Sequence, residues 1–183
     1  MSTVVALAGR RIDAQDGDGP ARFPPANAAA VGERIAAALR RLQARTLVSS
    51  AACGADLLAL EAAGELGIRR VVVLPFAADR FREVSVTDRP GGEERWGPAF
   101  DRVLRELPAG DLVVLAGSGE STEAFSAVNE RLLDEAIELA GTDGRAVALI
   151  AWDGASRDGD DLTAHFAEGA RSRGMEVEEV STL

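Results

Sequence analysis

Residues 47–56 read LVSSAACGAD and pass from a short apolar strand, through small side chains and one glycine, into a helical pattern. Small side chains let the backbone approach a ligand closely, and a helix N-terminus presents unpaired N–H groups to anions. The candidate ligand-binding residues of this turn are Ser49, Ser50, Cys53, Gly54, Ala55 and Asp56. The amides of Cys53, Gly54 and Ala55 would face a phosphate or ribose, and Asp56 would bind a sugar hydroxyl. The alternative is a tight turn in which Asp56 only complements the helix dipole.

Apolar strands alternate with helical patterns along the rest of the chain. The predicted strands are 3–8, 46–50, 71–75, 112–116, 146–151 and 176–180, and the predicted helices are 27–43, 55–66, 93–107, 123–140 and 160–173. Most of these strands are continuous apolar runs, as expected for strands covered on both faces, and the last mixes Glu with Val and should lie at an edge. The pattern predicts an α/β fold: a single doubly wound, mainly parallel, Rossmann-like sheet of about six strands with helices on both faces, in one domain over residues 1–183.

The helix ends and the strand order add further expectations. Asn27 should cap the first long helix, and Gly67, Gly141 and Gly174 should each follow a helix in a left-handed conformation. With the strand order 3-2-1-4-5-6, the chain reverses direction across the sheet between strands 1 and 4. Ligands of such sheets bind beyond the carboxyl ends of the strands near that point. The segments that follow strands 1, 2, 4 and 5 therefore form the candidate site.

Two connections are unusually long, namely residues 9–26 after the first strand and residues 77–92 after the third. Loops of that length in a compact domain are often functional. The second is expected to contain a short helix over 79–84, and the pair Gly91-Gly92 could hinge a lid. In that case Arg89 and Arg95 would close over a bound phosphate. The alternative is an exposed loop with solvated charges.

The charge and the cysteine content exclude several classes of function. All twenty basic residues are Arg, and the formal net charge is −10. The absence of Lys excludes a P-loop lysine and Schiff-base chemistry, and an acidic surface repels nucleic acid and anionic membranes. Cys53 is the only cysteine, so no intramolecular disulfide forms. Because no apolar run approaches ~18 residues and the N-terminus lacks a secretion-signal pattern, we expect a bacterial-type cytoplasmic location.

Further candidate residues lie where the first and fifth predicted strands end, namely Gly9, Arg10, Trp152 and Asp153. Arg10 is expected to clamp a phosphate, because its planar guanidinium suits bidentate contact. A surface ion pair with Asp13 or Asp16 is the alternative. Trp152 would stack on a base that Asp153 binds, unless the two residues only pack in the core and form a turn.

The turn at residues 49–56, followed by Ala59 and Ala62-Ala63, resembles the signature turn of the SLOG superfamily. This superfamily includes the DNA-processing protein Smf and the cytokinin-activating LOG enzymes. Weaker matches over roughly the first two-thirds of the chain are residues 5–11, residues 72–76, Phe81, Ser85-Val86, Trp96 and Phe100. The longer pattern is most similar to bacterial SLOG-like domains that accompany signalling modules. The resemblance implies a Rossmann-like domain that binds nucleotides or nucleotide-derived ligands.

The LOG enzymes hydrolyse an N-glycosidic bond in a nucleoside monophosphate, and their signature Pro-Gly-Gly-x-Gly-Thr-x-x-Glu would follow the fourth strand. Residues 117–123 read GSGESTE at that place, so glycines, a threonine and an acid remain, but the first Pro-Gly-Gly and the register differ. The candidate ligand-binding residues here are Gly117, Ser118 and Gly119, the candidate catalytic residues are Glu120, Glu123 and Asp56, and Thr122 is the candidate helix cap. A plain capped loop is the alternative.

These observations favour the binding or sensing of a nucleotide or nucleotide-derived ligand at the C-terminal edge of the sheet. A LOG-like nucleotide N-glycosidase, or phosphoribohydrolase, is one alternative, and a protein-interaction module with a vestigial pocket is another. The expected partner is a nucleotide-derived small molecule, without nucleic acid or membrane, while a homo-oligomer or a signalling partner stays open. No cofactor and no metal site is expected, since the aspartates of residues 13–18 lack the spacing of an EF-hand loop.

Overall fold

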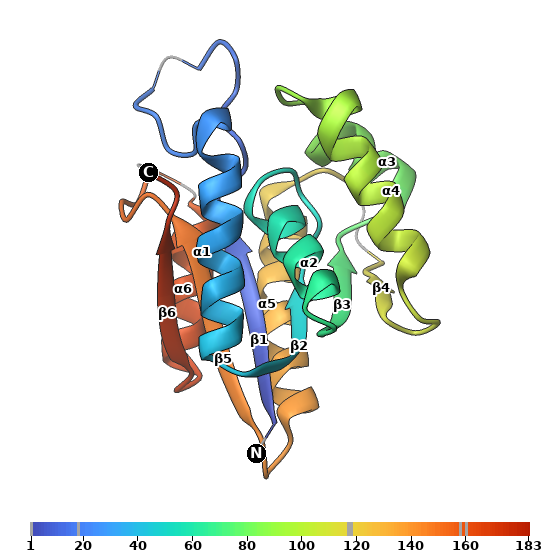
Figure 1. Ribbon diagram of the computed structural model, residues 1–183, viewed down its shortest axis with the longest axis vertical. Helices are drawn as coiled ribbons and strands as arrows, with labels where there is room; N and C mark the ends of the chain where they lie inside the picture. Colours follow the sequence, from blue (N-terminus) through green and yellow to red (C-terminus); the bar gives the residue numbers. More distant parts are fainter. Residues whose placement is uncertain (1, 18, 117–118, 158, 160) are drawn as a thin grey trace.

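The computed structural model describes residues 2–17, 19–116, 119–157, 159 and 161–183. The chain forms one six-stranded sheet in which all neighbouring strands are parallel, and helices cover both of its faces (Figure 1). The strands are β1 (Thr3–Gly9), β2 (Ala44–Ser49), β3 (Arg69–Leu74), β4 (Leu112–Val114), β5 (Arg145–Trp152) and β6 (Glu176–Ser181). The predicted α/β, Rossmann-like architecture is therefore confirmed.

Long helices connect most of these strands. They are α1 (Ala28–Arg41), α2 (Ala55–Glu65), α4 (Gly97–Glu106), α5 (Thr122–Ala140) and α6 (Leu162–Ser172). Shorter helical turns are η1 (Pro25–Asn27), α3 (Ala78–Phe81) and the π-helical turns η2 (Arg82–Val86) and η3 (Gly92–Trp96). The connection from β3 to α4 is thus mostly helical, and π-helical turns are frequent at functional sites.

The strand order is β4-β3-β2-β1-β5-β6, so the predicted order 3-2-1-4-5-6 is wrong. The fourth strand extends the sheet beyond β3, and β5 pairs with β1 after α5 has crossed the other face. β4 has three residues and leaves Leu112 and Val114 37% and 47% exposed, as an edge position allows. Its apolar sequence resembles that of a covered strand and gives no sign of an edge position. The chain therefore reverses between β1 and β5, and the segments that follow these two strands meet there.

The sheet separates two apolar layers. Val5 and Leu7 of β1 belong to the layer that also contains side chains of α1, α2 and α4, whereas Val4 and Ala6 belong to the layer of α5 and α6. This alternation is the two-residue period of a strand, and burial on both faces explains the continuous apolar sequence of β1. The loops at the carboxyl ends of the strands, at the top of Figure 1, are held in place by this rigid base.

Both predicted helix caps are wrong. Asn27 has helical backbone angles and no capping hydrogen bond, and its side-chain amide donates to the Thr182 carbonyl oxygen at 3.0 Å. The cap of α5 is Ser121 instead of Thr122, since the Ser121 hydroxyl accepts a hydrogen bond from an amide of the first turn. The sequence therefore located both helix starts to within a residue but assigned the wrong side chains to them.

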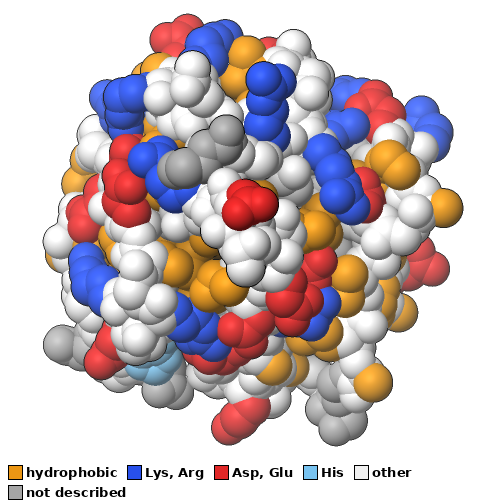
Figure 2. All heavy atoms as spheres, turned by 90° about the horizontal axis from the view of Figure 1, so that it is seen from below, with side chains coloured by type: hydrophobic (Ala, Val, Ile, Leu, Met, Phe, Trp, Pro, Cys, Tyr) orange, Lys and Arg blue, Asp and Glu red, His pale blue; other side chains and the backbone are white. Residues whose placement is uncertain are grey.

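The predicted helix ends and edge strand are confirmed. Gly67, Gly141 and Gly174 follow α2, α5 and α6 with φ angles of 68°, 61° and 71°, and β6 lies at the edge of the sheet. Figure 2 shows the face at the amino ends of the strands, where acidic and basic side chains are interspersed. Ion pairs such as Arg69–Asp111, at 2.7 Å, neutralise charge near these strand starts.

Candidate functional site

A cleft of about 910 Å³ opens at the carboxyl ends of the strands. Five segments border it: the connection after β1, the turn between β2 and α2, the helical turns after β3, the first half of α5 and the loop before α6. The lining residues used below are Gly9, Arg10, Arg11, Asp13, Arg22, Ser50, Ala52, Asp56, Phe81, Ser85, Arg89, Glu120, Phe125, Arg157 and Asp161. The cleft thus lies at the edge of the sheet where the sequence predicts a site.

The turn between β2 and α2 is closed by backbone, contrary to the expected free amides. The Cys53 amide donates to the Ser85 carbonyl at 3.0 Å, and the Ala55 amide donates to the Arg10 carbonyl at 3.1 Å. Gly54 bridges to Arg11, and a Cβ at Gly54 would lie 2.8 Å from the Arg10 carbonyl oxygen. The side chains of Cys53 and Ala55 are fully buried. The chain after β1 therefore occupies the position that a phosphate was expected to take.

The two serines and the glycine at the strand ends have different surroundings. Ser49 is fully buried, and its hydroxyl donates to the Leu7 carbonyl at 3.3 Å, so it connects β2 to β1. Ser50 is half-buried and lines the cleft. Gly9 also lines the cleft, and it is required where it stands, because an added Cβ would lie 2.5 Å from the Ala55 Cβ.

Asp56 is the one residue of the turn whose acidic group borders the cleft. It lies in the first turn of α2, is 8% exposed, and accepts a hydrogen bond from the Ala52 amide at 3.3 Å. Burial raises the pKa of Asp56 from 3.8 to about 7, and the Ala52 amide and the nearby Arg11 only partly oppose this effect. A carboxyl that gains or loses a proton near neutral pH inside a cleft is a candidate functional group.

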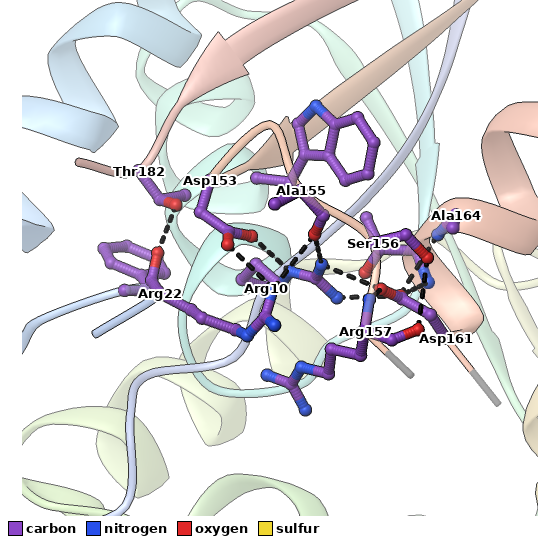
Figure 3. A network of polar contacts seen from close by, with 12 residues as sticks. Arg10, Arg22, Asp153, Ala155, Ser156, Arg157, Asp161, Ala164 and Thr182 are labelled. Atoms are coloured by element: carbon purple, nitrogen blue, oxygen red, sulfur yellow. Dashed lines mark hydrogen bonds and ion pairs between the residues drawn. The ribbon is translucent and has the colours of Figure 1, made fainter. Parts of the chain in front are cut away.

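Arg10 is buried in an ion-pair network instead of projecting toward a ligand (Figure 3). Its guanidinium donates to both Asp161 oxygens at 2.7 and 2.9 Å, to Asp153 at 2.9 Å and to the Ala155 carbonyl at 2.7 Å. Neither the expected phosphate clamp nor the surface pair with Asp13 or Asp16 matches these contacts. The two long segments after β1 and β5 meet at this network.

The charges of this network are mutually satisfied. Burial opposes ionisation of Asp161, but hydrogen bonds from Arg10 and from the amides of Arg157 and Ala164 outweigh it and hold the pKa of Asp161 well below its usual range. Burial also lowers the pKa of Arg10, yet the bonds to Asp161 and Asp153 outweigh this effect and raise it. Arg10 therefore stays charged and forms part of the wall that supports the cleft.

The side chains of Trp152 and Asp153 are directed at the network and at β6. The Trp152 Nε1 donates to Glu179 at 2.9 Å, and the Arg10 guanidinium lies 5.8 Å from the centre of the Trp152 ring. Asp153 accepts from both Arg10 and Arg22, at 2.9 and 2.8 Å. These contacts favour the alternative in which both residues are structural.

The loop before α5 approaches the cleft through Glu120. Gly117 and Ser118 lie outside the described residues, while Gly119 is exposed with a φ angle of 98°. Glu120 borders the cleft and pairs with Arg80. Glu123 is exposed on the first turn of α5, and no contact joins it to Asp56 among the described residues. The three candidate catalytic acids thus do not form one cluster.

Sequence reasoning missed most of the basic and aromatic side chains that give the cleft its chemical character. Arg11 and Arg157 line it, and so does Arg89, the one of these arginines that the sequence did suggest, as a lid residue over a phosphate. Phe125, which is half-buried, adds aromatic surface, and the fully buried Phe81 lies behind it. The consecutive residues Arg10 and Arg11 did indicate a basic side chain after β1. The sequence could not indicate which of the two enters the cleft. The predicted lid residue Arg95 lies elsewhere and pairs with Glu61.

Arg157 illustrates the basic character of the cleft. Its guanidinium points away from the Arg10 network in Figure 3 and pairs with no carboxylate among the described residues. Burial lowers the pKa of Arg157, and the nearby cations Arg10 and Arg22 add to this effect. An anion in the cleft would relieve that repulsion.

None of the described helices has the length and hydropathy needed to cross a membrane.

The sequence matches no protein-family model, and no curated protein sequence matches it either. Among solved structures, DNA processing protein A (DprA) from Streptococcus pneumoniae has a similar fold, with a TM-score of 0.55 and 18% sequence identity. The similarity covers 97% of this chain and 50% of DprA, so the chain spans about half the length of that protein. This likeness shows the fold, and it is the Rossmann-like fold that the resemblance of residues 49–56 implies.

A second structure, the carboxyl transferase domain of pyruvate carboxylase from Rhizobium etli, aligns with a TM-score of 0.28 and 11% identity, over 96% of this chain and 27% of that one. A similarity of that size carries no structural argument.

Proposed function

From a SLOG-like fold with this cleft, we propose that the protein binds a nucleotide or a nucleotide-derived small molecule at the carboxyl ends of its strands. The observation that carries the proposal is the combination of three chemical characters in one cleft of about 910 Å³. Arg11, Arg89 and Arg157 supply positive charge, Phe125 supplies aromatic surface, and Asp56 supplies a buried hydrogen-bonding acid.

Each of these characters matches one part of a nucleotide. Guanidinium groups suit phosphate oxygens, aromatic rings suit the face of a base, and a carboxylate accepts hydrogen bonds from the hydroxyls of a ribose. The volume is also in the range of small-molecule sites. Phe125 is half-buried, and its ring packs edge-on against Phe76 at 6.0 Å, so one face is held in place beside the cleft.

A thermal-shift screen of the full chain against nucleoside mono- and diphosphates, cyclic nucleotides and ADP-ribose-type compounds tests the proposal, with calorimetry on each compound that shifts the midpoint. A ligand at 100 times its Kd should raise the midpoint by roughly 5–10 °C in a protein of this size. Asp56→Asn should reduce the affinity. Arg102→Gln is the matched control, because Arg102 pairs with Glu61 outside the cleft. Absence of a shift with every compound would refute the proposal.

Hydrolysis of a nucleotide N-glycosidic bond is the second candidate function, and one observation favours it. Because burial raises the pKa of Asp56 to about 7, this carboxyl can carry a proton at neutral pH, as a general acid must. Chromatography after incubation with nucleoside monophosphates should then detect free base, and Asp56→Asn should abolish its release. If wild-type protein binds nucleotides and releases no base, the site binds without hydrolysis.

The name of the structural neighbour refers to DNA processing, so nucleic acid has to be considered as a third class of ligand. The net charge of −10 argues against it here, since nucleic-acid affinity comes from many simultaneous phosphate contacts. We therefore expect no change in the fluorescence anisotropy of a labelled single-stranded oligonucleotide at about 0.15 M salt. Binding that Arg157→Gln weakens would show that the cleft accepts a polymer.

A further inference from the structure

Arg11 enters the cleft with unused hydrogen-bonding capacity. Its Nη2 contacts the Asp88 carboxylate and the Cys53 sulfur, the latter at 3.6 Å. Its Nε is buried and has no hydrogen-bond partner among the described residues. The side chain as a whole is 29% exposed and faces the cleft.

Arg89 approaches the same carboxylate from the segment that follows η2. Its Nε lies 3.6 Å from the second oxygen of Asp88, which is beyond hydrogen-bonding distance, and this Nε is also buried without a partner among the described residues. The two oxygens of Asp88 thus face one guanidinium each. A single carboxylate stands between two cations, and it leaves the Nε of both unsatisfied.

A second carboxylate with two arginines provides a comparison. Glu61 pairs with Arg95 and Arg102 through contacts of 2.5 to 3.1 Å, and these two side chains are 44% and 50% exposed on the surface. Neither Arg95 nor Arg102 has a buried nitrogen without a hydrogen-bond partner among the described residues. At Asp88 the guanidinium groups are more buried and border a cleft, so their buried, unsatisfied Nε donors would become available to a ligand once Asp88 moves away.

We propose that Arg11 and Arg89 form an oxyanion subsite of the cleft that takes a phosphoryl group, and that Asp88 occupies this subsite as an internal competitor until the ligand displaces it. This proposal rests on the proposed function, because it assigns the anionic end of the ligand. A phosphoryl group has three oxygens and can accept from both Nε atoms as well as from the terminal nitrogens, which a carboxylate at the position of Asp88 does not do.

Displacement of Asp88 requires only a local movement. Asp88 is 33% exposed, and the segment that carries it is fixed on both sides, by the bond from the Thr87 amide to the Arg82 carbonyl at 3.0 Å and by that from the Gly92 amide to the Arg89 carbonyl at 2.9 Å. Because the backbone is held on both sides, we expect Asp88 to release both arginines by a change of its side-chain rotamer, while Arg89 stays in place.

Calorimetric titration of the 183-residue chain with inorganic pyrophosphate tests the subsite. Asp88→Asn removes the competing charge and should bind pyrophosphate up to about fivefold more tightly than the wild type, which corresponds to the loss of one partly exposed ion pair. Glu61→Gln is the matched control and should leave the affinity unchanged. Adding Arg11→Gln to Asp88→Asn should remove the gain. Circular dichroism establishes that each variant is folded.

Three outcomes would overturn the subsite: Asp88→Asn binds no more tightly than the wild type, Glu61→Gln produces the same gain, or Arg11→Gln has no effect. The nucleotide screen separates this failure from that of the proposed function. Nucleotide binding that Arg11→Gln leaves intact supports the function and refutes the subsite. A pyrophosphate gain in Asp88→Asn without binding of any nucleotide supports the subsite and refutes the function.

Discussion

Arg10 and Arg11 are consecutive in the sequence and have opposite environments in the structure. Arg10 is 4% exposed and is surrounded by two carboxylates and a carbonyl, whereas Arg11 is partly exposed and shares one carboxylate with Arg89. Successive side chains of extended backbone point in opposite directions, so one of the pair turns into the ion-pair network and the other into the cleft. The number of hydrogen-bond acceptors around each guanidinium therefore distinguishes Arg10, which is structural, from Arg11, for which we propose a binding role.

Replacing Arg10 should have the largest effect on stability, and replacing Arg11 a much smaller one. Arg10→Met leaves Asp161 buried without a cation and Asp153 paired with Arg22 alone, which should lower the free energy of unfolding by about 3–5 kcal/mol. Arg11→Met removes a partly exposed pair and should cost at most about 1 kcal/mol. Urea unfolding followed by circular dichroism measures both values. Equal losses would mean that the two arginines contribute alike to stability.

The backbone contact between these arginines and the turn before α2 should have the next largest effect. Gly54 has a φ angle of 106°, and an added Cβ would lie 2.8 Å from backbone atoms of Arg10 and Ile12, so Gly54→Ala should cost about 2–3 kcal/mol. Gly119 has a similar φ angle of 98° with no heavy atom near its added Cβ, so Gly119→Ala should cost only about 1 kcal/mol. The difference between the two variants in the free energy of unfolding measures the steric clash at Gly54. This difference would vanish if the segment after β1 could move away from the turn.

Asp56 should make stability depend on pH. Burial raises its pKa from 3.8 to about 7, so between these values the unfolded chain has released a proton that the folded protein retains. Stability from this group is complete below pH 3.8, falls as the pH rises and is lost above about pH 7. Between pH 5 and pH 8 the wild type should lose on the order of 2 kcal/mol more than Asp56→Asn, at 1.36 kcal/mol per pKa unit. Identical pH profiles in urea unfolding would mean that Asp56 titrates normally.

The fold could be predicted because periodicity reports burial, and burial on both faces produces the continuous apolar runs of β1, β3 and β5. Strand order could not, since the apolar sequence of β4 does not reveal that its neighbour lies on one side only. The face of the sheet on which α5 crosses from β4 to β5 depends on long-range packing, which no local sequence pattern encodes.

The candidate site could be predicted to the level of segments, but the side chains could not be assigned. The small residues of 49–56 correctly indicate close backbone approach, yet the approaching backbone belongs to Arg10–Ile12 and not to a ligand. Carboxylates more than 140 positions away decide the role of Arg10. Asp56 and Ser50 were found because they belong to the turn, whereas Arg157 and Phe125 carry no local signal.

Arg157 should produce the smallest change in stability. Its guanidinium pairs with no carboxylate among the described residues, and the cations Arg10 and Arg22 lie near it, so Arg157→Gln should alter the free energy of unfolding by less than about 0.5 kcal/mol. The same variant should weaken any nucleotide that shifts the wild-type midpoint. Arg171→Gln, at an exposed position of α6 where the arginine lies 3.7 Å from Glu179, should change neither quantity. Because Arg157 has no carboxylate partner among the described residues, its loss should leave no buried charge behind. If Arg157→Gln instead destabilised the protein as much as Arg10→Met, the arginines of the cleft would also stabilise the fold.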